Sequence, residues 1–348
     1  MHGSAACDIC CDGFHGGAAV FGGGGGTVFG TLIVCYLFLG GAGAGLCLVV
    51  TVLALRVPVD LVAVVAPRRY GGGCGRVVDA PGAYRRLIGA GYAVSLVALA
   101  LGMVCLLADV GRADRVLLLL MYPTGSFIAV GTWALVLCSV LALLLACVWA
   151  GLVRAGVLVV RVLSVLTLAV ALVVMVYTGL LLQSLDAIPL WATPWLPVLF
   201  VLSSFSCGIA LALGMAQFTE TASVFGAVLR RLAAVDALTV VFEAAVVALL
   251  IVTAPVVVPG AGNGTAQALE TSVWALVAGP GSWLFWGGFV GVGLVLPFMF
   301  DLVLVHTRQP RPLLAVAAAT CVLVGGFVMR FCVMGAGMHP VLMAGSLF

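Results

Sequence analysis

The chain has 348 residues, of which 64% are hydrophobic and only 8% are charged. Because soluble domains carry about 25% charged residues, this composition predicts an integral membrane protein and excludes a soluble enzyme. The net charge of +3 is spread thinly, without a basic patch that has aromatic residues between its charges, and this excludes a nucleic-acid-binding surface.

Residues 1–27 form the expected N-terminal tail, and its glycine run at 22–26 is a flexible lead-in to the first apolar stretch. We find no basic segment followed by an apolar run and a small-residue cleavage site, so we expect no cleaved signal peptide. Cys7, Cys10 and Cys11 are close together and would need His15 as the fourth ligand of a zinc or iron–sulfur site. We favour a disordered tail over a metal site, and the sequence leaves the role of these cysteines open.

The rest of the sequence, residues 28–348, is predicted to be one membrane domain. A bilayer core of about 30 Å needs about 20 apolar residues per helix. We expect eight such helices, so the predicted fold class is all-α. The helices are expected to pack as two four-helix bundles side by side. The spans expected by this criterion are residues 28–55, 87–107, 126–150, 158–182, 195–217, 234–258, 282–304 and 313–336.

The arginines predict the orientation of this domain. Arg112 and Arg115 lie between spans 2 and 3, and Arg330 lies inside span 8. By the positive-inside rule the arginine-rich loops are cytoplasmic, so both termini and the turn at 109–115 are extracytoplasmic. The other twelve arginines lie in or beside the loops that follow spans 1, 3, 5 and 7: Arg56, Arg68, Arg69, Arg76, Arg85, Arg86, Arg154, Arg161, Arg230, Arg231, Arg308 and Arg311.

The longest of these loops, residues 57–86, is rich in glycine and proline. Its apolar piece at 61–66 is too short to cross the bilayer, and we expect it to lie in the membrane interface. No loop is long enough to form a catalytic domain. The chemistry of this protein is therefore expected in its spans, its short outer loops and a partner protein.

The positions of the four histidines indicate whether this protein can bind haem. His2 and His15 lie in the tail, His306 lies at the cytoplasmic end of span 7, and His339 follows span 8. Membrane b-type cytochromes hold haem between helices, usually with histidine ligands. Since no histidine is expected inside a span, we predict no haem and no metal in this protein.

Span 1 carries the small-residue sequence 40–45, in which Gly41 and Gly45 are four residues apart. Such a pair allows two helices to approach closely. A smooth wall for a flat ring or an isoprenoid tail is the alternative, and we favour close helix packing.

Tyr177 is expected within about two turns of the outer surface, because span 4 ends near residue 182. A phenol at that depth can donate a hydrogen bond to a quinone carbonyl while its ring stays in hydrocarbon. Tyrosine also commonly anchors a helix at the membrane interface. The spacing alone leaves these two interpretations equal.

Arg330 is a costly charge within a span and needs a carboxylate partner or a polar cavity. Asp109 and Asp186 are the candidate partners, since both are expected near the outer surface.

Three acidic residues fall in spans 6 and 7, namely Glu243, Asp236 and Asp301. Together with Arg330 they could form a proton-conducting path, although solvation at the interface is the favoured interpretation for the two aspartates. Glu243 lies deeper, where burial favours the neutral form of a carboxyl group.

A set of short motifs in sequence order resembles the NrfD/polysulfide-reductase membrane-subunit family, whose members are quinone-reactive anchors of complex iron–sulfur molybdoenzymes. The resemblance covers residues from about 30 to 340 and depends on the order of the motifs, because each alone is weak. The motifs are Tyr36-Leu37-Phe38-Leu39-Gly40-Gly41, Asp109-Val110-Gly111-Arg112, Gly131-Thr132-Trp133, Tyr177-Thr178-Gly179, Pro189-Leu190-Trp191 followed by Leu199-Phe200, and Gly325-Gly326-Phe327 with Arg330.

This resemblance implies a membrane anchor without haem that binds menaquinone or ubiquinone near the outer face of a bacterial or archaeal inner membrane. It implies an extracytoplasmic four-cluster ferredoxin-like partner, which connects to a molybdopterin or multihaem catalytic subunit. The protein would then carry the quinol-oxidation half-reaction as a non-catalytic subunit of a quinone-dependent oxidoreductase, with quinol oxidation as the favoured direction.

The resemblance also implies residue roles. Tyr177 would donate a hydrogen bond to the quinone, while Asp109 and Arg112 would shape the docking face beside the ring. Some family members use a histidine at the outer end of span 1, where this sequence has Thr27 and Thr31; either threonine, or an ordered water, could replace it. Asp109 or Asp186 would release the protons.

Two other classes remain open. A proton-coupled secondary transporter or channel would use Glu243, Asp236, Asp301 and Arg330. A packing or assembly subunit would bind no quinone. Transport by the purified protein alone would favour the former, and failure to bind any quinone the latter.

Overall fold

The computed structural model describes residues 26–58, 63–67, 74–79, 81–110, 127–184, 188, 190–253, 263–279, 281–307 and 311–337. Most of the expected tail, including Cys7, Cys10 and Cys11, lies outside these residues, as do Arg112 and Asp186. Within them the membrane domain is helical, which confirms the predicted class. Helices satisfy their own backbone hydrogen bonds, as a polypeptide in hydrocarbon must.

Eight helical segments are long and apolar enough to cross a membrane in the described part of the protein, as predicted. The first four are α2 (Gly26–Arg56), the continuous run of α4 (Gly82–Tyr84), η2 (Arg85–Gly89) and α5 (Ala90–Val110), then α7 (Phe127–Trp149) and α8 (Val157–Gln183). The second four are α9 (Trp195–Phe218), α10 (Gly226–Thr253), the run of η3 (Leu284–Val295) and α12 (Leu296–His306), and α13 (Pro312–Gly337).

The seventh span is π-helical over η3 and α-helical over α12. Pro297 stands at the start of α12 and has no backbone N–H to donate. The regular hydrogen-bond ladder is therefore interrupted where the two segments meet, and a π-helical segment is a common form of such an interruption.

Several boundaries differ from the expectations, and two of the expected loops contain further secondary structure. Span 2 begins at Gly82 rather than 87, which places Arg85 and Arg86 within the helical run. Span 6 begins at Gly226 rather than 234, so Arg230 and Arg231 lie within α10. Their charge suggested a loop, but long basic side chains can extend from a helix end toward water. The loop expected at 259–281 contains a further helix, α11 (Asn263–Val277), which was not predicted.

The other loop with further secondary structure is 57–86. Over its described part, the piece expected in the membrane interface is a β-strand, β1 (Ala63–Pro67), paired antiparallel with β2 (Cys74–Val78). The register runs from Ala63 opposite Val78 to Pro67 opposite Cys74. The strand pairing supplies backbone hydrogen bonds between the two sides of the loop.

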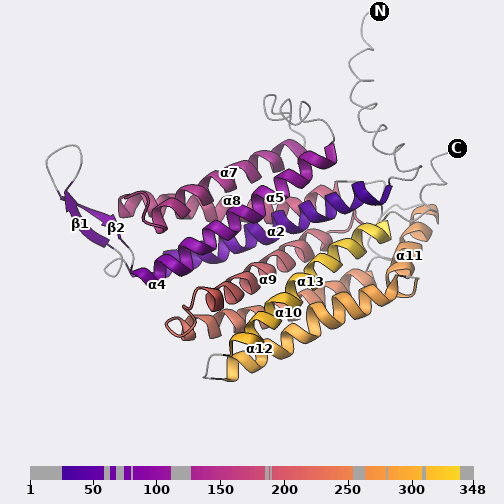
Figure 1. The fold of residues 1–348 in the computed structure, drawn as a ribbon. Coiled ribbons are helices and arrows are strands. Elements are labelled where there is room, and N and C mark those ends of the chain that lie inside the picture. The colour runs from indigo at the N-terminus through magenta and orange to yellow at the C-terminus, as the bar shows by residue number, and fades with distance from the viewer. Residues whose placement is uncertain are drawn as a thin grey trace, which may run out of the picture.

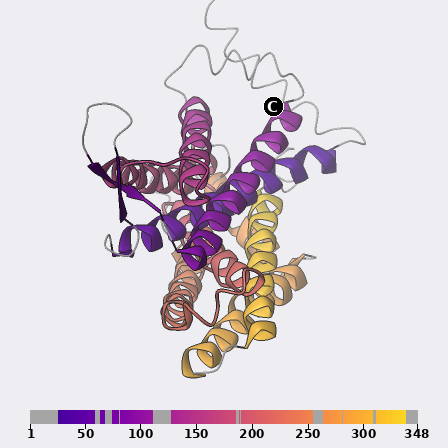
Figure 2. The same ribbon diagram turned by 60° about the vertical axis from the view of Figure 1, so that its left-hand side comes forward.

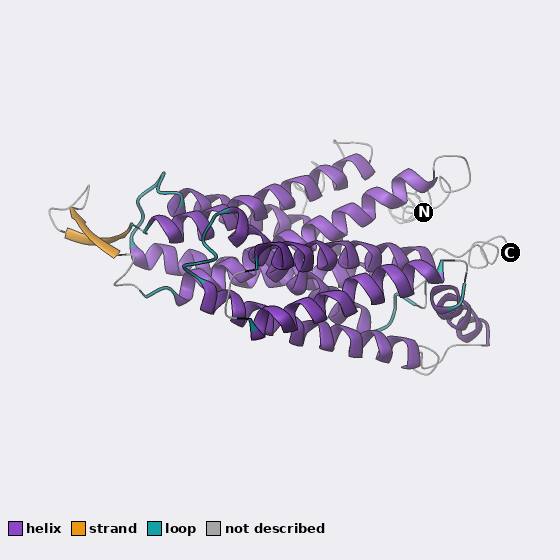
Figure 3. Cartoon of the chain, turned by 60° about the horizontal axis from the view of Figure 1, so that its bottom comes forward, coloured by secondary structure: helices purple, strands orange, loops and turns teal. Residues whose placement is uncertain are grey.

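The helices of the two halves of the sequence lie on two sides of the molecule (Figure 1), and turning it by 60° shows the same division (Figure 2). In the first half α2 packs on α5 and α8, and α7 packs on α5 and α8. In the second half α9 packs on α10 and α13, and α12 packs on α10 and α13. The start of α2 and the end of α13 lie at one end, and the β-hairpin lies at the other (Figures 1 and 3).

The two halves meet where α2 crosses α9. A Cβ atom added at Gly45 would overlap the backbone carbonyl of Ser204, and one added at Gly208 would overlap the backbone of Gly45. The small residues of span 1 therefore serve close helix packing, which was the favoured interpretation.

Gly208→Ala should destabilise the protein by about 1–3 kcal/mol, because the added methyl group has no space at the crossing. Thermal unfolding in detergent measures this loss. Gly335→Ala is the matched control, since no described atom lies within 4 Å of a Cβ atom added there. Equal melting temperatures for the two variants would contradict the close crossing.

Candidate functional site

Two tyrosines from different helices meet inside the first half of the domain. The hydroxyl of Tyr36 on α2 donates a hydrogen bond of 3.3 Å to the hydroxyl of Tyr177 on α8. The side chains are 2% and 5% exposed, respectively. An interfacial anchor would keep its ring at the lipid surface, so the burial of Tyr177 argues against that interpretation.

A third helix fixes the position of Tyr177. A Cβ atom added at Gly131 on α7 would overlap the Tyr177 ring. The phenol therefore occupies the space that a side chain at residue 131 would take. This contact holds the ring between α2, α7 and α8.

Asp109 lies in the last turn of α5, at the same end of the domain as the tyrosine pair. Helices α2 and α5 contact at Gly40 and Gly102, and counting residues outward places Asp109 roughly one turn beyond Tyr36. Asp109 is half-buried, and its Oδ1 atom has no hydrogen-bond partner in the described part of the protein. A carboxylate at a helix C-terminus is also disfavoured by the helix dipole, so Asp109 is available to a proton or a partner.

The remaining predicted outer residues are less informative. Thr31 is exposed on α2, five residues before Tyr36, while Arg112 and Asp186 lie outside the described residues. Trp191 donates a hydrogen bond of 3.0 Å from Nε1 to the carbonyl of Val333. This bond ties the segment before α9 to α13.

Arg330 is completely buried in the second half. Its Nη1 atom donates to the Ser203 hydroxyl at 3.2 Å and to the Gly326 carbonyl at 2.8 Å, and its Nη2 atom donates to the Ser204 hydroxyl at 2.9 Å. The guanidinium also lies over the rings of Phe38 and Phe200. Both rings can stabilise the cation by a cation–π interaction.

No ion pair of Arg330 is present among the described residues. The expectation that Asp109 is its partner is therefore wrong, while Asp186 cannot be assessed. Hydroxyls, a carbonyl and aromatic faces solvate this cation in place of a carboxylate. Glu243 is a carboxyl group that acts on it electrostatically, without direct contact.

Three acidic side chains continue inward from Arg330. Glu243 on α10 lies near Ser203, which accepts a hydrogen bond from Arg330, and Asp236 is about two turns away on the same helix. Asp301 lies near Asp236, on α12, which packs against α10. We call Arg330, Ser203, Glu243, Asp236 and Asp301 the buried polar chain.

The burial of these acids corrects one expectation. Asp236 is 1% exposed and Asp301 is 0% exposed, so solvation of the two aspartates at the interface is wrong. Among the described residues, neither oxygen of Asp301, nor Oδ1 of Asp236, has a hydrogen-bond partner. Because α10 begins at Gly226, Glu243 also lies beyond the midpoint of its helix, deeper than expected.

The sequence also matches that of known proteins. Residues 20–341 match the family model described as polysulphide reductase, NrfD. The chain belongs to the NrfD family. The predicted resemblance is thereby confirmed over nearly the whole sequence, and the multi-span architecture agrees with a family of membrane subunits.

Two relatives illustrate the degree of similarity. The C subunit of polysulfide reductase from Wolinella succinogenes is 32% identical over 179 residues, which are 51% of this protein and 54% of that one. Protein NrfD of Escherichia coli is 29% identical over 177 residues, 51% of this protein and 53% of that one. Each of these matches spans about half the length of the relative.

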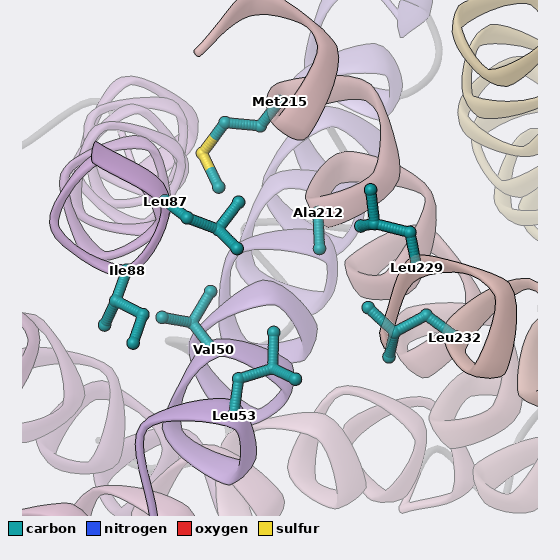
Figure 4. Close-up of a pocket in the computed structure, with 8 residues that line it drawn as sticks. All are labelled: Val50, Leu53, Leu87, Ile88, Ala212, Met215, Leu229 and Leu232. Atoms are coloured by element: carbon teal, nitrogen blue, oxygen red, sulfur yellow. The ribbon is translucent and has the colours of Figure 1, made fainter. Parts of the chain in front are cut away.

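An apolar cleft lies elsewhere in this NrfD-family protein, between α2, η2, α9 and α10 (Figure 4). It is too narrow for a water molecule, and its described lining offers no polar side chain to orient a quinone head group. The cleft is thus a packing gap rather than a second site. Its lining residues are Val50, Leu53, Leu87, Ile88, Ala212, Met215, Leu229 and Leu232.

Sequence reasoning missed Tyr36 as a site residue, although it stands in the first family motif. It also missed Ser203 and Ser204, which hold Arg330. A tyrosine ten residues into α2 and two serines in span 5 carry no spacing signal of their own. Only the packing of α2 against α8, and of α13 against α9, gives them partners.

Arg330→Met should lower the free energy of unfolding by about 3–5 kcal/mol, because it leaves buried hydroxyls and Glu243 without their cation. Arg231→Met, at an exposed position, should stay within about 0.5 kcal/mol of wild type. Thermal unfolding of the purified protein measures both changes. A similar loss in the two variants would contradict the structural role of Arg330.

Proposed function

We propose that this protein is the membrane anchor of a respiratory oxidoreductase, binding quinol or quinone near the outer membrane face and exchanging electrons with an extracytoplasmic iron–sulfur subunit. The observation that carries the proposal is the hydrogen-bonded pair of Tyr36 and Tyr177 at one end of the domain. Family membership supports it, as does the relative named as a subunit of polysulfide reductase.

The tyrosine pair suits recognition of a quinone carbonyl. Tyr36 donates to Tyr177, so the proton of the Tyr177 hydroxyl is not used in that bond and can be donated to the ligand. In a buried site such a bond is not weakened by competing water. Gly131 holds the ring in place, which limits the entropy lost on binding.

Oxidation of one quinol releases two electrons and two protons. We propose that the electrons pass to the iron–sulfur partner and that Asp109 and Asp186 carry the protons toward the outer surface. The unpaired Oδ1 atom of Asp109, about one turn outside Tyr36, supports its part in this role. Menaquinone and ubiquinone both present the carbonyl that this site would bind.

The partner would dock on the same end of the domain. We propose that Asp109 and Arg112 shape the contact with a four-cluster ferredoxin-like subunit, which leads to a molybdopterin or multihaem catalytic subunit. Thr31 is exposed on α2 beside this end and is a further candidate contact for the head group.

We also propose the orientation and grouping of the spans. Helices α2, α5, α7 and α8 would form one four-helix bundle, and α9, α10, η3 with α12, and α13 the other; their mutual contacts support this grouping. Both termini would lie outside the inner membrane, as the arginine distribution favours.

A second candidate function is proton-coupled transport or a proton channel, and the buried polar chain favours it. Unpaired buried carboxyl groups in a membrane domain are costly and commonly functional. Proton uptake by vesicles that contain this protein alone, without quinone or partner, would select this function over the anchor role.

Tyr177→Phe should lower quinol-linked electron transfer about tenfold, the loss of roughly 1.4 kcal/mol of hydrogen bonding. Assembly of the complex should be unchanged. Turnover with a soluble quinol analogue measures the effect, and unchanged turnover would remove Tyr177 from the site.

The matched control is Tyr92→Phe, which removes another buried hydroxyl, 3.0 Å from that of Thr51. Tyr92→Phe should leave turnover near wild type, which separates loss of function from loss of stability. Tyr36→Phe should give an intermediate loss, because it removes only the bond that orients Tyr177.

Asp109→Asn combined with Arg112→Ala should weaken retention of the iron–sulfur subunit during purification. The control is Asp79→Asn with Arg85→Ala, since these side chains form an exposed ion pair of 2.8 Å beside the β-hairpin, at the opposite end. Subunit stoichiometry after affinity purification measures both. Full co-purification with the Asp109/Arg112 variant would contradict the proposed docking face.

A further inference from the structure

A second cavity lies at the end of the domain opposite the tyrosine pair. It has a volume of about 260 Å³, is open to the surface, and is lined by α9, α10, the segment between them, and the ends of α12 and α13. Unlike the apolar cleft, it is lined by polar side chains as well as apolar ones. Those that matter here are Gln217, Ser223, Arg230, Thr307 and Arg311.

The cavity concentrates positive charge. In the described part of the protein neither Arg230 nor Arg311 makes an ion pair, and no acidic side chain lines the cavity. Nη1 of Arg230 lies 3.8 Å from the position of a Cβ atom on Gly226, the first residue of α10. The guanidinium therefore sits over a helix N-terminus, where a cation is disfavoured.

Helix geometry adds to this charge. The first N–H groups of a helix have no partner within it, and Gly226 and Ala227 of α10 border the cavity. The carbonyl of Arg311 accepts the first hydrogen bond of α13, from the N–H of Ala315, so Arg311 stands at a second helix N-terminus. Two arginines and the first residues of two helices thus border one space, and all four would attract an anion bound there.

The rim indicates the kind of anion. Val224, which lines the cavity, is 63% exposed. Phe218 and Leu313 follow the lining residues Gln217 and Arg311 by one and two positions in the sequence and are 78% and 86% exposed. Apolar side chains this exposed in a membrane protein suit contact with acyl chains. The cavity is also smaller than the roughly 300–1,000 Å³ of pockets that enclose whole ligands. It therefore fits a head group whose apolar part stays outside.

We propose that this cavity binds the phosphate head group of an anionic membrane phospholipid. Arg230 and Arg311 hold the phosphate, while Ser223, Gln217 and Thr307 offer hydrogen bonds to the glycerol or phosphate oxygens. Basic pockets between transmembrane helices bind anionic lipid head groups in this way. This site is independent of the quinone site and does not rest on the proposed function.

The inner wall of the cavity lies close to the buried polar chain. Ala233 and Leu304 line the cavity, and each lies three residues from a member of the buried polar chain, Asp236 and Asp301, on the same helix face. A bound head group would therefore lie about one helical turn from this carboxyl pair.

The test uses the full-length protein, with any partners that co-purify, after delipidation in detergent. Phosphatidylglycerol, phosphatidylcholine and inorganic phosphate are added separately, and bound molecules are counted by native mass spectrometry. We expect phosphatidylglycerol to bind, and Arg230→Gln and Arg311→Gln each to weaken its binding about fivefold, from roughly 1 kcal/mol per arginine.

Arg231→Gln is the matched control, because Arg231 is the next residue on α10, is exposed, and does not line the cavity. It should bind phosphatidylglycerol as wild type does. Equal binding of phosphatidylglycerol and phosphatidylcholine, or equal weakening by all three arginine variants, would overturn the proposal. Binding of inorganic phosphate as tightly as phosphatidylglycerol would assign the cavity to a soluble anion and overturn the lipid assignment.

Discussion

The close crossing of α2 and α9 is the constraint on which the rest of the structure depends. Gly45 and Gly208 bring the two backbones into contact, and this contact joins the halves of the domain. It also places Ser204 beside Gly41, at the depth where Arg330 of α13 donates to it. In hydrocarbon, association of helices relies on such packing and on interhelical hydrogen bonds, because burial of apolar surface gives no advantage over lipid.

The crossing also separates two kinds of polar site. The first half of the domain buries the phenols of Tyr36 and Tyr177 near one end and that of Tyr92 toward the other, while the second half buries Arg330 and three carboxyl groups. Neutral donors can accept a hydrophobic ring as a neighbour at low cost, whereas buried carboxyl groups need a proton or a counter-charge. The division would let the proposed quinone site and the series of acids occupy one domain without direct contact.

Sequence reasoning predicted the parts of this structure that depend on length and composition. Eight apolar segments of sufficient length gave eight spans, and Gly41 with Gly45 indicated a close helix contact. Sequence reasoning failed where a contact depends on which face of a helix a residue occupies. Hydropathy is nearly uniform around α2 and α9, so nothing in the sequence shows that Tyr36 faces Tyr177 or that Ser203 faces Arg330.

Two expectations about arginines were wrong. Arg230 and Arg231 were expected in the loop between spans 5 and 6, yet both lie on α10 near its end. For Arg330 the expectation was a carboxylate partner or a polar cavity, with Asp109 as one candidate, yet serines and aromatic rings surround it. The solvation of a cation depends on three-dimensional neighbours that a linear pattern does not contain.

The contact between Gly131 and Tyr177 has one more consequence. Gly131 is four residues from Phe127, where α7 begins, and α7 follows the segment that carries Arg112. Since no side chain separates the α7 backbone from the phenol ring, α7 cannot slide or tilt at this level without displacing that ring. A displacement of the first turns of α7 would thus pass directly to the phenol.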